Sequence, residues 1–81
     1  MIKIVFQKEK NRSVALDNDI EVGECTFTQD GEIWNINHTG VIEAYRGQGI
    51  AKRLVEIITK EAEKQNKTVR AQCSYAARNI K

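Results

Sequence analysis

The feature that most constrains the fold of this 81-residue chain is a glycine-rich turn between a strand pattern and a helix pattern. The turn lies within residues 44–54, contains Gly47 and Gly49, and leads into a helix pattern at Ile50. The first N–H groups of a helix lack partners within the helix and point out of its N-terminus. Glycines let an anion approach the backbone, and Arg46 adds a planar cation suited to phosphate oxygens. The stretch therefore predicts a pyrophosphate site.

The spacing of this turn excludes two familiar phosphate loops. In a Walker A loop, Lys and a hydroxyl residue follow the second glycine, whereas Ile50 and Ala51 follow Gly49 here. A dinucleotide-binding fingerprint needs a third glycine where this chain has Lys52. A glycine pair before a helix can also be a tight turn without a ligand, and this interpretation stays open.

Composition and charge favour one small domain that spans residues 1–81. An apolar fraction of 41% supports a modest core, and 30% charged residues argue against disorder. A net charge of +2 is too balanced to indicate a nucleic-acid binder. We expect no membrane span, because no segment approaches the ~20 apolar residues required, and no signal peptide. Two cysteines without a secretory signal are expected to be reduced, so the expected location is cytoplasmic.

The first half of the chain alternates apolar and polar residues, which predicts strands joined by polar turns. The parity of the third strand changes near Gly23, which predicts a β-bulge there. The pair Asp30-Gly31 predicts a hairpin with a type I′ turn. The four expected strands are residues 2–6, 13–16, 20–29 and 32–42.

The second half predicts a crossover. Apolar residues at helical spacing predict a helix over residues 50–65 that Asn66 ends. Residues 68–73 alternate and predict a strand parallel to the one before the helix, and Ser74 is a candidate cap for a short final helix. The expected fold is a mixed α/β (α+β) sheet, an antiparallel meander followed by a β-α-β crossover and a short C-terminal helix. Its ligand would lie at the carboxyl ends of two parallel strands.

The turn also resembles the coenzyme A signature of the GNAT superfamily of N-acetyltransferases. That signature reads Arg or Gln, two residues, Gly, one residue, then Gly or Ala, and Arg46, Gly49 and Ala51 occupy its three defined positions. Residues 38–41 and Cys73 are similar to a small subfamily of minimal acetyl-CoA-binding proteins. The resemblance implies a minimal GNAT-like fold that binds acetyl-CoA.

The implied activity is transfer of the acetyl group of acetyl-CoA to an amine, without metal. The superfamily normally carries one or two helices between its first strands, which build much of the acceptor site, and this sequence has only short polar turns there. The acceptor, a small molecule or a protein, is therefore not identified. The residues expected to contact the cofactor are Thr39, Gly40, Val41, Arg46, Gly47, Gln48, Gly49, Ile50, Ala51 and Asn79.

Three side chains are candidates for the chemistry. His38 is the sole histidine and a ready base near neutral pH, although its alternation with Trp34 and Ile36 favours a core histidine. Tyr75 follows the last strand, where GNAT relatives often place the tyrosine that protonates the departing thiolate, and a packing role is equally open. Cys73 is either a buried core thiol or, as the resemblance implies, a thiol beside the cofactor that accepts the acetyl group.

Backbone groups complete the expected site. The N–H groups near Gly40 and Val41 would serve the thioester carbonyl if that strand carries a bulge, and the pantetheine arm would pair with the same strand. Two other functions stay open. One is a non-catalytic acetyl-CoA-binding module or sensor. The other, ranked well behind, is a nucleic-acid module, since the turn lacks the G-x-x-G spacing and aromatic residues are sparse.

Overall fold

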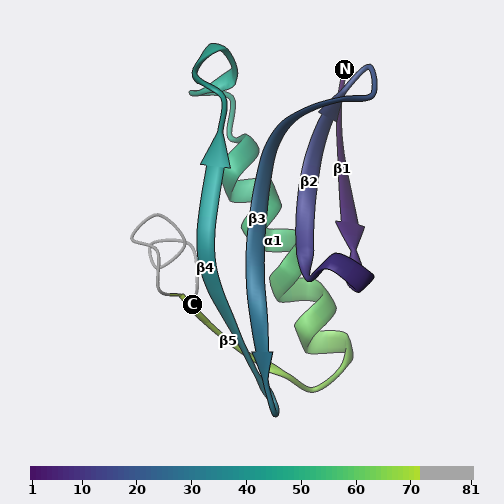
Figure 1. The fold of residues 1–81 in the computed structure, drawn as a ribbon, viewed down its shortest axis with the longest axis vertical. Helices are drawn as coiled ribbons and strands as arrows, with labels where there is room; N and C mark the ends of the chain where they lie inside the picture. Colours follow the sequence, from purple (N-terminus) through teal and green to yellow (C-terminus); the bar gives the residue numbers. More distant parts are fainter. Residues whose placement is uncertain (72–81) are drawn as a thin grey trace.

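The computed structural model describes residues 1–71, which form five strands and one α-helix (Figure 1). The predicted order of four strands, a helix and a strand is confirmed. Two 3₁₀ turns, Lys8–Lys10 and Glu43–Tyr45, lie in connections. The end of the last expected strand at Cys73 and the expected final helix lie outside the described residues. The elements are β1 (Ile2–Gln7), β2 (Arg12–Asp17), β3 (Ile20–Asp30), β4 (Ile33–Val41), α1 (Ile50–Lys64) and β5 (Thr68–Ala71).

The strands form one mixed sheet in the order β1-β2-β3-β4-β5. The first three pairings are antiparallel, and β5 is parallel to β4. Helix α1 connects β4 to β5 and packs on one face of the sheet (Figure 1). The predicted meander and crossover are therefore confirmed, and within residues 1–71 the fold is a two-layer α+β arrangement. None of the helices in this range is long and apolar enough to cross a membrane.

The core lies between α1 and the sheet. Ser13 is buried in it and donates its hydroxyl to the carbonyl oxygen of Leu54 at 2.9 Å, which ties β2 to the helix. Three aromatic rings, Phe6, Phe27 and Trp34, stack across β1, β3 and β4. The helix contributes the buried residues Ile50, Leu54, Val55, Ile58 and Ala62.

Turn residues fix the connections. Asn66 follows α1 in the left-handed conformation, as predicted. Asn18 and Asp19, between β2 and β3, both have positive φ. The expected type I′ turn after β3 is wrong, because residues 31 and 32 form the connection and only Gly31 has a positive φ, whereas that turn needs two such residues.

Two β-bulges change which side chains face the helix. Ala15 lies opposite Gly23 and Leu16 opposite Glu21, so Val22 is the extra residue and the bulge predicted near Gly23 is confirmed. A second register shift leaves Asn37 of β4 as the extra residue, because Thr26 lies opposite His38 whereas Phe27 lies opposite Ile36.

The second bulge reverses the alternation of β4. Trp34 and Ile36 are buried, whereas His38, which simple alternation would place beside them, is exposed. The expectation of a core histidine is therefore wrong. The physical reason is the extra residue at Asn37, because one inserted residue moves every following side chain to the other face.

The described part of β5 pairs with the first half of β4. β5 lies beside Ile33 to Ile36 of β4, with Thr68 opposite Ile33 and Ala71 opposite Ile36. On its other side, β4 pairs with β3 up to Val41.

Candidate functional site

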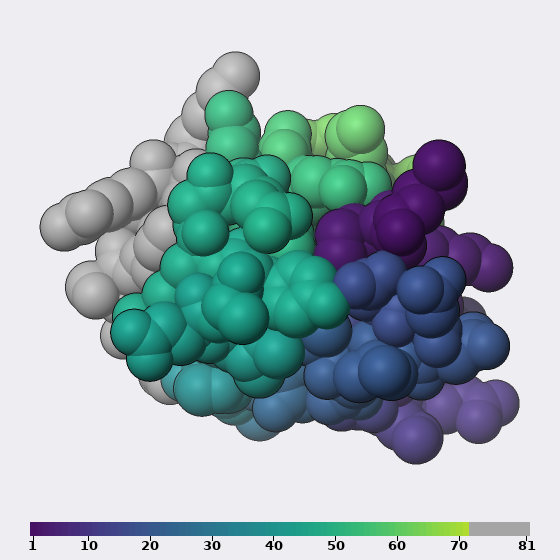
Figure 2. All heavy atoms as spheres, turned by 90° about the horizontal axis from the view of Figure 1, so that it is seen from above, coloured from purple at the N-terminus to yellow at the C-terminus, as the bar shows by residue number. Residues whose placement is uncertain are grey.

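A pocket of about 560 Å³ lies between the end of β4 and the start of α1. Figure 2 looks down on this end of the molecule, where the teal loop after β4 lies beside the blue turn between β2 and β3. Eight of the ten residues expected to contact a cofactor line the pocket, whereas Gln48 does not and Asn79 lies outside the described residues. The lining residues are Thr39, Gly40, Val41, Tyr45, Arg46, Gly47, Gly49, Ile50 and Ala51.

The N-terminus of α1 lines this pocket with backbone N–H groups that have no acceptor within the helix. Gly49 precedes α1 with a φ of 75°, and no side chain of residues 1–71 caps it. Its carbonyl accepts the N–H of Arg53 at 3.2 Å, so the amides of residues 50–52 have no acceptor within the helix. The first turn carries no acidic residue. This end of α1 therefore presents amide donors and the positive end of the helix dipole to the pocket.

The backbone conformation of the loop favours glycine at two positions, although neighbouring atoms would leave room for a side chain at both. Gly47 and Gly49 have φ values of 84° and 75°, which disfavour any residue with a Cβ. A Cβ at either position would meet no atom within 4 Å. The space over both glycines is open, so a ligand has access to the backbone of the loop.

Arg46 is one of the residues that line the pocket. It is exposed, and its Nε reaches the carbonyl oxygen of Val41 at 3.5 Å, which is the long limit of a hydrogen bond. The guanidinium thus lies between the end of β4 and the loop. It is free to exchange this weak contact for an anion in the pocket.

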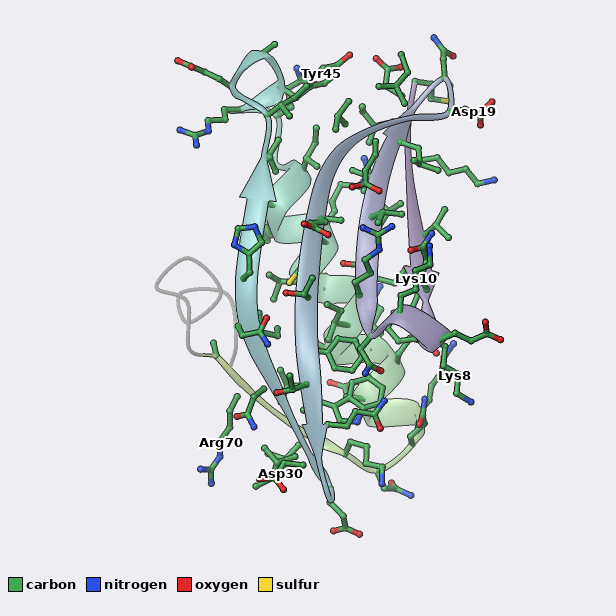
Figure 3. All side chains as sticks on the ribbon, viewed as in Figure 1. Lys8, Lys10, Asp19, Asp30, Tyr45 and Arg70 are labelled. Atoms are coloured by element: carbon green, nitrogen blue, oxygen red, sulfur yellow. The ribbon has the colours of Figure 1, made fainter. Side chains whose placement is uncertain are left out.

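Tyr45 is a lining residue that the sequence reasoning missed. Its hydroxyl donates to Oδ2 of Asp17 at 2.6 Å, and Oδ1 of Asp17 lies 3.3 Å from the N-terminal amine. The hydrogen bond from Tyr45, followed by the contact with the amine, lowers the pKa of Asp17, and the same hydrogen bond raises the pKa of Tyr45. Figure 3 shows Tyr45 at the end of the molecule that also carries the turn with Asp19. The only sequence signal was an aromatic residue directly before Arg46.

His38 lies beside the pocket rather than in it. A Cβ added at Gly40 would lie 3.0 Å from Nε2 of His38, so the imidazole rests against that glycine. His38 and Gly40 line a second hollow of about 290 Å³, which shares Gly40 and Val41 with the larger pocket. The structure therefore brings the predicted base next to the predicted carbonyl-binding residues.

Charged residues border this second hollow. Glu21 and Glu24 line it, and both pair with Arg12, at 3.1 Å and 2.9 Å. The hydrogen bond to Glu24 is the largest cause of a raised pKa of Arg12. One guanidinium thus faces two carboxylates, and the border of the hollow keeps a net negative charge.

Thr39 connects the pocket to the core. Its Oγ1 lies 3.2 Å from Sγ of Cys25, which is fully buried. The bulge puts Thr39 and Val41 on the helix side of β4 and His38 and Gly40 on the other. The other two predicted catalytic residues, Cys73 and Tyr75, lie outside the described residues.

Comparisons with known proteins agree with this geometry. The family model of the GCN5-related N-acetyltransferases matches residues 12–81. A search of curated proteins finds no matching relative.

Solved structures share the fold. A GCN5-like protein from Staphylococcus aureus is 29% identical with a TM-score of 0.72, and the match covers 94% of this chain and 74% of that one. A GCN5-related N-acetyltransferase from Sphaerobacter thermophilus is 22% identical with a TM-score of 0.71 over 76% of this chain, which spans only 21% of that one. The NatC complex bound to Gag peptide and CoA is 29% identical with a TM-score of 0.59, over 69% of this chain and 42% of the NatC chain.

Proposed function

Because this chain belongs to the GCN5-related N-acetyltransferase family, we propose that it binds acetyl-CoA between β4 and α1 and transfers the acetyl group to an amine. The observation that carries the proposal is that one pocket joins the start of α1, which no side chain of residues 1–71 caps, to the end of β4. The first supplies amide donors for a pyrophosphate, and the second supplies the backbone groups of residues 39–41 for an amide-rich arm. Coenzyme A contains both groups.

The pyrophosphate is assigned to the loop and the first turn of α1. The amides of Ile50 and Ala51 donate to its oxygens, and the helix dipole favours its negative charge. Gly47 and Gly49 leave room for the phosphates, and Arg46 turns from Val41 to pair with them. The NatC complex, which resembles this chain, is bound to CoA, and this supports the assignment.

We assign the pantetheine arm to the end of β4, at residues 39–41. Its amides pair with the strand in the manner of an added strand, and the thioester carbonyl lies near the N–H groups of Gly40 and Val41. These donors stabilise the negative charge that develops on that oxygen when the amine attacks. Thr39, Gly40 and Val41, which line the pocket, lie beyond the bulge at Asn37.

The transfer needs one bond formed and one broken. The amine nitrogen attacks the thioester carbonyl, the C–N bond forms, and the C–S bond breaks to release CoA as a thiolate. His38, beside Gly40, accepts the proton that the amine loses. The thiolate takes up a proton, for which Tyr75 is the donor that the resemblance implies. Acylation of Cys73 remains an alternative first step.

A second candidate function is acetyl-CoA binding without turnover. The observation that favours it is the shortness of the connections between the first strands, where residues 8–11 and 18–19 leave no room for helices that would hold an acceptor. Release of free CoA thiol from acetyl-CoA, measured with a panel of primary amines, separates the two functions. Saturable binding without any thiol release would identify a binding module or sensor.

The binding site itself is tested with two aspartate variants. Gly49→Asp adds a side chain and a negative charge to the pyrophosphate site, and we expect it to cost about 2 to 4 kcal/mol of acetyl-CoA binding. Gly31→Asp is the matched control, because Gly31 also has positive φ and open surroundings but lies in the hairpin after β3. Calorimetry on both variants decides the matter. Equal affinity in the two folded variants, or no binding by the wild type, would refute the proposed site.

A further inference from the structure

One short hydrogen bond ties the proposed cofactor loop to the first half of the chain. Tyr45, which lines the pocket, donates its hydroxyl to Oδ2 of Asp17 at 2.6 Å. Asp17 ends β2 and does not line the pocket. Among residues 1–71, the hydrogen bond from Tyr45 is thus the contact that connects Asp17 to the pocket lining.

Both partners of this bond belong to well-fixed segments. Asp17 pairs with Ile2 of β1 and Ile20 of β3, directly before the tight turn to β3. Tyr45 donates its backbone N–H to the carbonyl of Ile42 at 2.9 Å, and its ring packs against the core. The carboxylate makes the bond charge-assisted, which is the stronger kind.

The loop after Tyr45 is otherwise loosely held. Within residues 1–71, the only side-chain hydrogen bond from residues 46–49 is the 3.5 Å contact of Arg46 with Val41. Two of these four residues are glycines, which have the largest conformational freedom to lose. The loop is fixed again at Ile50, which is buried. Tyr45 and Ile50 are thus its two anchors.

We propose that Asp17 is a positioning residue for the cofactor loop, acting through Tyr45 to hold Arg46 and the start of α1 in the arrangement that receives the pyrophosphate. The proposal rests on the acetyl-CoA site proposed above. Ordering a flexible loop at the moment of binding costs affinity, and a loop already ordered avoids that cost. Loss of the Asp17–Tyr45 bond should therefore weaken CoA binding more than it weakens the fold.

The test measures the Kd for CoA by calorimetry in matched variants. Tyr45→Phe and Asp17→Ala each remove the bond, and we expect each to weaken binding about tenfold, the scale of one charge-assisted hydrogen bond. The double variant should be no worse than either one. Asp17→Asn keeps an acceptor for the hydroxyl and should recover most of the affinity. Thr26→Ala removes an equally short 2.6 Å bond to Asn37, outside the pocket lining, and should leave Kd unchanged.

Two further readouts separate positioning from a purely structural role. In the free protein, the amide NMR signals of Gly47 and Gly49 should shift in Tyr45→Phe and Asp17→Ala but not in Thr26→Ala. A lower Tm with unchanged Kd and unchanged glycine signals would overturn the proposal. If the wild type does not bind CoA, the proposed function fails, and the glycine signals still report whether Asp17 arranges the loop.

Discussion

His38 shows how one side chain can lie next to a site without contributing to the core. Its ring rests against Gly40, is exposed to solvent, and borders a hollow that shares two residues with the proposed cofactor pocket. The exposed imidazole can exchange protons with solvent, and histidine is the side chain most often used as a base near neutral pH. We therefore expect His38 to contribute to the reaction rate rather than to the free energy of unfolding.

The variant His38→Gln tests this role. We expect acetyl transfer or acetyl-CoA hydrolysis to fall by about 10² to 10⁴, the usual contribution of a general base. Because the side chain is exposed, the free energy of unfolding should change by no more than about 0.5 kcal/mol. Steady-state rates and urea denaturation of the same preparation give both quantities. An unchanged rate would remove His38 from the mechanism.

The Asp17–Tyr45 pair makes stability depend on pH at both extremes. The pKa of Asp17 is lowered in the folded state, so its stabilising contribution is present at neutral pH and is lost as the pH falls below about 4. The pKa of Tyr45 is raised, so its contribution is present at neutral pH and is lost as the pH rises above about 10.

Urea midpoints of the wild type and Asp17→Asn, measured between pH 7 and low pH, test the acid limb. The two midpoints should differ at neutral pH and converge as Asp17 takes up its proton. A constant difference over the whole acid range would mean that the Asp17 carboxylate does not carry the effect.

At the scale of elements, the site depends on how closely β3, β4 and α1 approach one another. Gly23 allows that approach, because a Cβ there would lie 3.2 Å from the carbonyl oxygen of Gly40 and 3.3 Å from Cδ1 of Leu54. The first neighbour is backbone and the second is a fully buried side chain. The lack of a side chain at Gly23 therefore lets the end of β4 and the helix pack closely against β3.

Gly23→Ala should destabilise the fold by about 1 to 3 kcal/mol, the usual cost of overpacking. Gly40→Ala is the comparison, since its Cβ would meet only the end of the exposed His38 ring, which can move. Denaturant midpoints of both variants provide the measurement. Equal midpoints for the two variants would contradict this account of the packing.

Local patterns predicted most of these elements from the sequence. Alternation located the strands, the parity change located the bulge near Gly23, and helical spacing located α1. A bulge in β4 was considered only as a condition, near Gly40, and it lies at Asn37 instead. His38 was consequently assigned to the wrong face. The bond between Tyr45 and Asp17 was missed because 28 residues separate them and only the folded sheet brings them together.

At the scale of the whole molecule, one end of β4 packs in the core and the other lines the proposed site. The aromatic stack of Phe6, Phe27 and Trp34 supports the half of β4 that is paired on both sides. The proposed acetyl-CoA site lies at the other half, which faces the start of α1 across the pocket. The crossover connection brings the start of α1 to the carboxyl end of β4, which is why the glycine-rich turn was informative about the location of the site.

An amide NMR titration of the wild-type protein with acetyl-CoA tests this central claim most directly. The account predicts saturable shifts at the end of β4 and the start of α1, namely at Gly40, Val41, Gly47, Gly49, Ile50 and Ala51. The signals of Phe6, Phe27 and the Trp34 indole, in the aromatic stack, should stay in place. No shifts at millimolar acetyl-CoA, or shifts concentrated at the aromatic stack, would contradict it.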